Sequence, residues 1–123
     1  MLLSLDFSGD LPIYQQLRNQ IVLGIASGAL RPGEKLPTIR ALADELGINM
    51  MTVSKAYQIL KQEGYIASDR RNGAWVAPKT DGRAALDKLE NALRLIVAEA
   101  RVSGIGMETV TEMMQKLYQA GEE

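Results

Sequence analysis

The chain has 123 residues, 46% of them hydrophobic, with 14 Lys and Arg against 15 Asp and Glu and neither His nor Cys. This length suits one small domain with an appendage, and the missing residue types exclude disulfides, zinc fingers, thiolate nucleophiles and Ser-His-Asp catalysis. No metal-ligand set, phosphate loop or effector motif is present, so we expect no cofactor and no metal, and the effector ligand is unknown. The apolar start is too short for a signal peptide, and no apolar run approaches the roughly 18 residues of a membrane span. These features predict a cytoplasmic protein with no membrane partner.

The first predicted helix covers about residues 12–27. Pro12 stands at its first position, where the missing N–H costs nothing, and Gly28 ends it. Apolar residues at helical spacing predict one buried stripe, which consists of Ile13, Tyr14, Leu17, Ile21 and Ile25. Arg31-Pro32-Gly33 then predicts a turn.

Two short helices joined by a tight turn follow. Thr38 is a candidate N-cap for a helix over about 38–46, and Asn49 for a helix over about 50–63. Gly47-Ile48-Asn49 alone separates them, and glycines at 47 and 64 suit the two C-terminal ends. Two short helices with a three-residue turn are typical of a helix-turn-helix unit.

A two-stranded hairpin is predicted directly after the third helix. Residues 65–69 and 74–76 favour extended structure, and an Asn-Gly turn signal lies between them in Arg70-Arg71-Asn72-Gly73. A hairpin at this position is a wing. The expected fold is therefore mainly α with a small β-hairpin, as a winged helix-turn-helix domain over residues 1–78.

Residues 79–123 are expected to form a separate helical hairpin, with helices over about 83–103 and 108–119 after a linker at 79–82. The apolar seam of the first helix lasts only about two heptads, which is too short for a coiled coil. The two helices nevertheless carry more apolar positions than such a tail can bury alone, so we expect a homodimer formed through them. The expected dimerisation residues are Leu86, Leu89, Leu93, Ile96, Val97, Val110, Met113, Met114 and Leu117.

Charge is distributed unevenly between these two parts. Residues 1–80 hold nine bases and seven acids, a net charge of +2, whereas residues 81–123 hold five bases and eight acids, a net charge of −3. The third helix carries no acid between Asn49 and Gln62, which suits a helix that faces phosphates, because a carboxylate there is repelled by DNA.

The third helix also has two chemically different faces. With Val53 at the centre of the inward face, a helical wheel places Ala56, Tyr57 and Leu60 beside it. The outward face then holds Met51, Lys55, Gln58 and Gln62, with Thr52, Ser54 and Lys61 at its sides. Gln and Lys bond to base edges, and Met contacts the methyl group of thymine. A merely solvated helix is the ordinary alternative, but the short helix before it and the basic hairpin after it favour DNA recognition.

Basic residues outside the third helix are further candidates. Arg70 and Arg71 suit the neighbouring minor groove or its phosphates. Lys35 and Arg40 suit the DNA backbone, although Arg40 has an alternative partner in Asp44, four residues further along the helix.

At this point a linked series of motifs resembles the GntR family of bacterial transcription regulators, over roughly residues 11–77. The series is Pro12-Ile13-Tyr14-Gln15-Gln16-Leu17, Leu30-Arg31-Pro32-Gly33-Glu34-Lys35-Leu36-Pro37-Thr38-Ile39-Arg40, Leu46-Gly47-Ile48-Asn49, Thr52-Val53-Ser54-Lys55-Ala56-Tyr57 and Glu63-Gly64-Tyr65-Ile66. The short tail is similar to that of the YtrA subfamily, whose two tail helices serve dimerisation. The resemblance implies a regulator, commonly a repressor of a neighbouring transporter operon.

The resemblance also implies DNA contacts at Arg40, Asn49, Thr52, Ser54, Lys55 and the wing. Together with the positions argued above, the candidate DNA-binding residues are Lys35, Thr38, Arg40, Asn49, Met50, Met51, Thr52, Ser54, Lys55, Gln58, Arg70, Arg71, Asn72 and Gly73. Two departures stand out. Asn49-Met50-Met51 replaces the Asn-Pro-Asn frequent in the subfamily, and Asn72-Gly73-Ala74-Trp75 keeps one glycine of the family's Gly-x-Gly-aromatic wing. The operator sequence therefore cannot be borrowed from relatives.

These observations predict a sequence-specific regulator that binds double-stranded DNA as a homodimer, at a palindromic operator with half-sites about one helical turn apart. A winged-helix module that docks proteins instead of DNA is the alternative, and Met50 and Met51 keep it open. An enzyme is not expected, because no titratable pair has a catalytic spacing.

Overall fold

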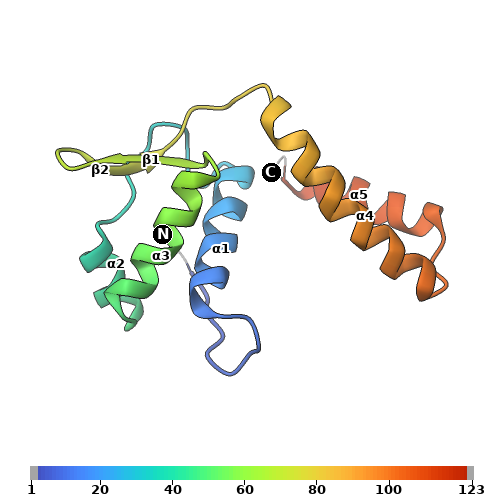
Figure 1. Ribbon diagram of the computed structural model, residues 1–123, viewed down its shortest axis with the longest axis horizontal. Coiled ribbons are helices and arrows are strands. Elements are labelled where there is room, and N and C mark those ends of the chain that lie inside the picture. The colour runs from blue at the N-terminus through green and yellow to red at the C-terminus, as the bar shows by residue number, and fades with distance from the viewer. Residues whose placement is uncertain (1–2, 122–123) are drawn as a thin grey trace. The chain divides into compact units, whose positions relative to one another are not determined.

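The structure, a computed structural model, describes residues 3–121 and divides between Pro78 and Lys79 into two compact units. It is mainly helical with one antiparallel hairpin, which confirms the expected fold class (Figure 1). The elements are α1 (Ile13–Ser27), α2 (Ile39–Leu46), α3 (Met50–Gln62), β1 (Ile66–Asp69), β2 (Gly73–Val76), a 3-10 turn (Arg83–Ala85), α4 (Leu86–Val102) and α5 (Met107–Gly121).

The core of the first unit forms where α1 and α2 pack against α3. The stripe expected on α1 is confirmed, since Leu17 and Ile21 are fully buried and the other three members are partly buried. The inward face predicted for α3 is confirmed as well, because all four of its residues, Val53, Ala56, Tyr57 and Leu60, are buried. The side chains that complete this core are Leu30, Leu36, Leu42, Ala43, Val53, Ala56, Tyr57, Leu60, Ile66, Ala74 and Val76.

The ends of the helix-turn-helix follow local capping chemistry. The Thr38 hydroxyl accepts a hydrogen bond from the Ala41 N–H at 3.0 Å, and Asn49 Oδ1 accepts one from the Met51 N–H at 2.7 Å. Gly47 adopts φ +67°, a left-handed conformation that costs glycine little. Pro12 is the N-cap of α1 and not its first residue, a shift of one position from the sequence prediction.

The hairpin pairs Ile66 with Val76 and Asp69 with Gly73, which leaves residues 70–72 as a three-residue loop. The turn is thus one residue longer than a two-residue Asn-Gly turn, and Gly73 takes φ +74° at its end. The segment before α2 pairs with the other edge of β2. Leu36 donates to the Ala74 carbonyl, and the Val76 N–H donates to the Glu34 carbonyl, both at 2.9 Å. The sequence of that segment predicted a turn at Arg31-Pro32-Gly33 and no extended structure.

Two glutamines of α1 hold the chain that precedes the helix. The Asp6 N–H donates to Gln16 Oε1 at 2.8 Å, and Gln16 Nε2 donates to the Leu11 carbonyl at 2.7 Å. One turn further on, Gln20 Oε1 accepts from the Ser4 N–H at 2.8 Å. Because the spacing of four residues places both amides on one face of the helix, they hold the preceding chain segment along α1.

An ion pair joins α1 to the end of α3. Arg18 Nε and Nη2 each lie 2.9 Å from one carboxylate oxygen of Glu63, and both side chains are only 18% exposed. The guanidinium also lies 5.5 Å from the centre of the Tyr65 ring. The planar guanidinium group forms two hydrogen bonds to one carboxylate and also stacks on an aromatic ring. The ammonium group of Lys does not reproduce this geometry.

We therefore expect Arg18→Ala to lower the free energy of unfolding by about 1–2 kcal/mol, because the part-buried Glu63 carboxylate loses its bidentate hydrogen bonds from Arg18. Arg18→Lys should recover less than half of the loss. Urea unfolding followed by circular dichroism measures both. Equal stability of wild type and Arg18→Ala would contradict this role, and full recovery by Lys would show that charge alone matters.

The second unit has no core of its own, since no side chain described between residues 79 and 120 is buried. The first predicted tail helix begins later than expected, because residues 83–85 form a 3-10 turn. An apolar groove of about 570 Å³ runs between α4 and α5. Seven of the nine expected dimerisation residues line it, together with Glu99, Ala100, Ser103, Ile105 and Tyr118. Leu86 and Leu89 are exposed but lie outside the groove.

None of the described helices is both long and apolar enough to span a membrane.

Candidate nucleic-acid interface

The outward face of α3 is exposed along its length, as its sequence predicts. Met51, Lys55, Gln58 and Gln62 are exposed, and Thr52 and Ser54 are half-buried at its sides. Since α1 and α2 cover the opposite face, this surface is the one that α3 can offer to a ligand. It bears no carboxylate from Met50 to Gln62.

Lys55 has a partner that its position on the helical wheel does not reveal. Its Nζ lies 4.0 Å from the centre of the Tyr14 ring on α1, within the range of a cation–π contact. The ammonium group is therefore held toward α1, at one side of the exposed face. Helical periodicity predicts Lys55 on the outward face but not its contact with Tyr14, which is 41 positions away in the chain.

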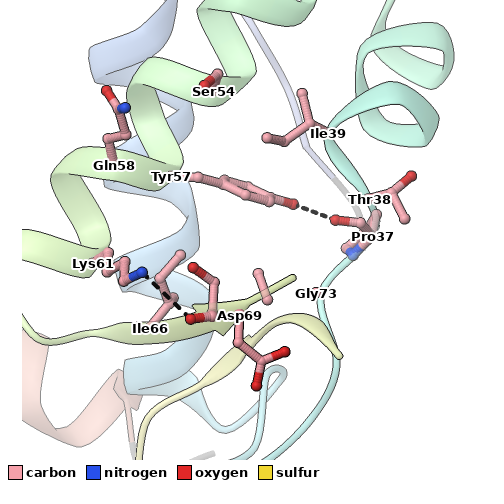
Figure 2. A pocket seen from close by; sticks show the side chains of 12 residues that line it. Pro37, Thr38, Ile39, Ser54, Tyr57, Gln58, Lys61, Ile66, Asp69 and Gly73 are labelled. Carbon is pink, nitrogen blue, oxygen red and sulfur yellow. Dashed lines mark hydrogen bonds between the residues drawn. The ribbon is translucent and has the colours of Figure 1, made fainter. Parts of the chain in front are cut away.

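A cleft of about 420 Å³ lies on the other side of this face, between the start of α2, α3 and the hairpin (Figure 2). Figure 2 shows Ser54 and Gln58 on α3 across the cleft from Thr38 and Ile39, with the hairpin below. Four candidate DNA-binding residues line it: Thr38, Ser54, Gln58 and Gly73. The structure thus brings together three segments that are separate in sequence.

Tyr57 braces the inner wall of this cleft. Its hydroxyl donates a hydrogen bond to the Pro37 carbonyl at 2.8 Å, which ties α3 to the start of α2. Burial raises the pKa of Tyr57 to about 12. Above pH 10 the unfolded chain therefore releases this proton before the folded chain does.

This difference predicts that Tyr57 makes the folded state lose stability as the pH rises from about 10 to about 12, by up to about 1.4 kcal/mol per pH unit. Tyr57→Phe should be less stable than wild type by about 1 kcal/mol at pH 8, because the hydrogen bond to Pro37 is lost. At pH 11 the gap should close or reverse. Urea unfolding of both proteins at the two pH values measures it, and the other tyrosines cancel in the comparison. Parallel pH profiles would contradict the assignment.

The wing tip is organised by Asp69. Its Oδ1 accepts a hydrogen bond from the Asn72 N–H at 2.6 Å, and its Oδ2 accepts one from Asn72 Nδ2 at 3.0 Å. These hydrogen bonds from Asn72, the backbone one first, hold the pKa of the Asp69 carboxyl below its usual value. The Lys61 charge lowers it further, and Lys61 Nζ donates to the Ser68 carbonyl at 3.3 Å. Asp69 therefore closes the loop from which Arg70 and Arg71 project, both exposed.

The remaining candidates lie around these elements. Lys35 is exposed in the segment that bridges to Trp75, and Arg40 is exposed in the first turn of α2. Within residues 3–121, Arg40 forms no ion pair with Asp44, so that alternative is wrong in this structure. Asn49 uses its Oδ1 as a cap, which leaves its amide NH2 to offer to a ligand. No group of three or more carboxylates fit for a metal occurs among the described residues.

Comparison with known proteins adds to this geometry. The model of bacterial regulatory proteins of the gntR family matches residues 11–76. The HTH-type transcriptional repressor YtrA of Bacillus subtilis is 29% identical over 119 residues, which is 94% of this chain and 92% of that protein. A transcriptional antiterminator from Listeria monocytogenes EGD-e superposes with a TM-score of 0.88 at 27% identity, over 98% of this chain and 92% of that one.

A third similarity is to a DNA-binding domain. The DNA-binding domain of AraR, solved in complex with the operator ORX1, is 31% identical with a TM-score of 0.56. It covers 61% of this chain and 96% of its own.

Proposed function

Since the chain belongs to the GntR family of bacterial regulatory proteins and is a transcriptional regulator, not an enzyme, we propose that it represses transcription by binding a palindromic operator as a homodimer. The observation that carries this proposal is the exposed, acid-free face of α3 beside an ordered hairpin with two arginines at its tip. AraR, whose similar domain is seen with an operator, supports it.

We assign the DNA contacts by element, all within residues 1–78. The exposed face of α3 enters the major groove, with Met50, Met51, Thr52, Ser54, Lys55 and Gln58 toward the bases. The phosphates beside the major groove are approached by Thr38, Arg40, Asn49 and Lys35. The loop from Arg70 to Gly73 reaches the adjacent minor groove or its backbone.

We assign the dimer interface to residues 79–123. The groove between α4 and α5 leaves apolar side chains in water along both helices, and a second copy of the same hairpin covers them. Two-fold symmetry then doubles the phosphate contacts and sets half-sites about one helical turn apart. Repression follows the named role of YtrA. A cytoplasmic location and control of a neighbouring transporter operon complete the proposal.

The test is fluorescence-anisotropy titration of the protein with two duplexes, each at several salt concentrations. One carries the DNA upstream of its own gene, and the other a scrambled version. Tighter binding to the first, with log affinity falling linearly with log salt, is the expected result. No binding to either duplex at low salt would overturn the proposal and favour a module that docks proteins through Met50 and Met51.

A further inference from the structure

Two methionines, Met50 and Met51, are the first two residues of α3. Met51 is 78% exposed and Met50 is 43% exposed. Among the described residues of α2, α3 and the hairpin, they are the exposed large apolar side chains. Large apolar groups left in water on an otherwise polar face indicate a surface that is covered when the protein works.

The backbone that carries these methionines is fixed. Asn49 Oδ1 accepts the Met51 N–H at 2.7 Å, and the Asn49 carbonyl accepts the Thr52 N–H at 3.0 Å. The side chains themselves stay adaptable, because Met is unbranched and its thioether is polarisable. The first turn of a recognition helix is the part that contacts base edges.

The polar groups near Met51 lie to either side of it. Lys55 is held over the Tyr14 ring on α1, and Ser54 and Gln58 line the cleft toward the hairpin. Met51 is therefore an apolar side chain with hydrogen-bonding side chains on both sides of it. In the major groove the standard bases present one apolar group, the C5 methyl of thymine.

We propose that Met51, with Met50 packed beside it in the complex, reads thymine methyl groups, so that each operator half-site carries thymine opposite the start of α3. This inference rests on the proposed DNA-binding function and adds the base class that the site selects. A methionine neither donates a strong hydrogen bond nor carries charge, so its selectivity arises from the methyl contact.

The experiment begins with selection of preferred duplexes from a random-sequence pool by the wild-type protein. Each thymine of the selected half-site is then replaced by deoxyuridine, which removes the methyl group and keeps every hydrogen-bonding group. We expect wild-type affinity to fall about fourfold at one or two positions, and about 15-fold when both half-sites are changed. Met51→Ala should bind the thymine duplex more weakly and show no response to deoxyuridine.

Met107→Ala is the matched control, because Met107 is an exposed methionine on α5. It should keep the full response to deoxyuridine. If deoxyuridine changes nothing at any thymine, or if Met51→Ala still responds to it, the inference is overturned while the regulator proposal stands. If the pool yields no preferred sequence, the proposed function fails and the inference fails with it. A circular dichroism melt confirms that Met51→Ala is folded.

Discussion

Leu93→Glu is expected to weaken dimerisation at least about 100-fold and to abolish tight operator binding. Leu93 lines the groove between α4 and α5 and is 41% exposed in the single chain. A second copy that covers the groove buries this position, and by symmetry each dimer then buries two new carboxylates. An unpaired buried charge costs about 3–5 kcal/mol, and about 2.8 kcal/mol already corresponds to a 100-fold loss of affinity. Sedimentation velocity at several concentrations measures the change.

Leu95→Glu is the matched control, because the same substitution two positions away falls outside the groove. Leu95 is 63% exposed on α4 and lines neither of the cavities along that helix. It should remain dimeric and bind DNA as wild type does. A monodisperse wild-type monomer at micromolar concentration would contradict the dimer outright. Equal weakening by both substitutions would move the interface away from the groove.

Loss of the dimer carries through to DNA. A monomer engages one half-site, so it neutralises half as many phosphates, and its affinity depends less steeply on salt. Leu93→Glu should therefore show a shallower salt dependence and a much smaller preference for the specific over the scrambled duplex. The pair of variants links the second unit to operator recognition with no change to any residue of the first unit.

The fold of the first unit could be predicted because its signals are local. Three residues, Thr38, Gly47 and Asn49, mark helix ends through bonds to backbone groups two to four residues away, so neighbouring residues suffice to identify them. The buried face of α3 follows from helical periodicity alone. The same reasoning fails at residues 83–85, where a 3-10 turn precedes α4 and Ala85, the N-cap of α4, makes no side-chain cap.

Pairs distant in the chain could not be predicted. Arg18 meets Glu63 across 45 positions, and Lys55 meets Tyr14 across 41. Periodicity assigns each of these residues to a face, but the packing of α1 on α3 decides which one it contacts. Lys55 shows the consequence for the candidate interface, since it is exposed on the outward face as expected but its ammonium group lies over the Tyr14 ring.

The structural role of Asp69 could not be predicted from sequence. In the chain it is an acid beside two arginines, with no visible link to the shape of the loop. In the structure both of its oxygens accept bonds from Asn72, so the carboxylate shapes the loop that presents Arg70 and Arg71. Spacing alone does not distinguish a neighbouring charge from a turn-closing acceptor.

The double substitution Arg70→Ala with Arg71→Ala is expected to weaken binding to every DNA sequence and to flatten its salt dependence. Both side chains are exposed on a loop whose shape depends on Asp69 and Asn72, so their loss leaves the fold intact. Each phosphate contact contributes about 0.9 to the slope of log affinity against log salt. Two arginines in each of two protomers therefore predict a slope shallower by about 3–4. Anisotropy titration at four salt concentrations measures it.

The size and sequence dependence of this loss separate two roles for the wing. If both arginines contact phosphates, specific and scrambled duplexes weaken together, and the slope changes in full. If one enters a narrow minor groove, the loss is larger for duplexes with A·T-rich flanks. Removing equal charge from α4 and α5, with Arg101→Ala and Lys116→Ala, should leave the slope nearly unchanged, because the proposed function places no DNA contact on those helices. An unchanged slope in the Arg70 and Arg71 variant would remove the wing from the interface and leave α3 and the start of α2 as the DNA-binding surface.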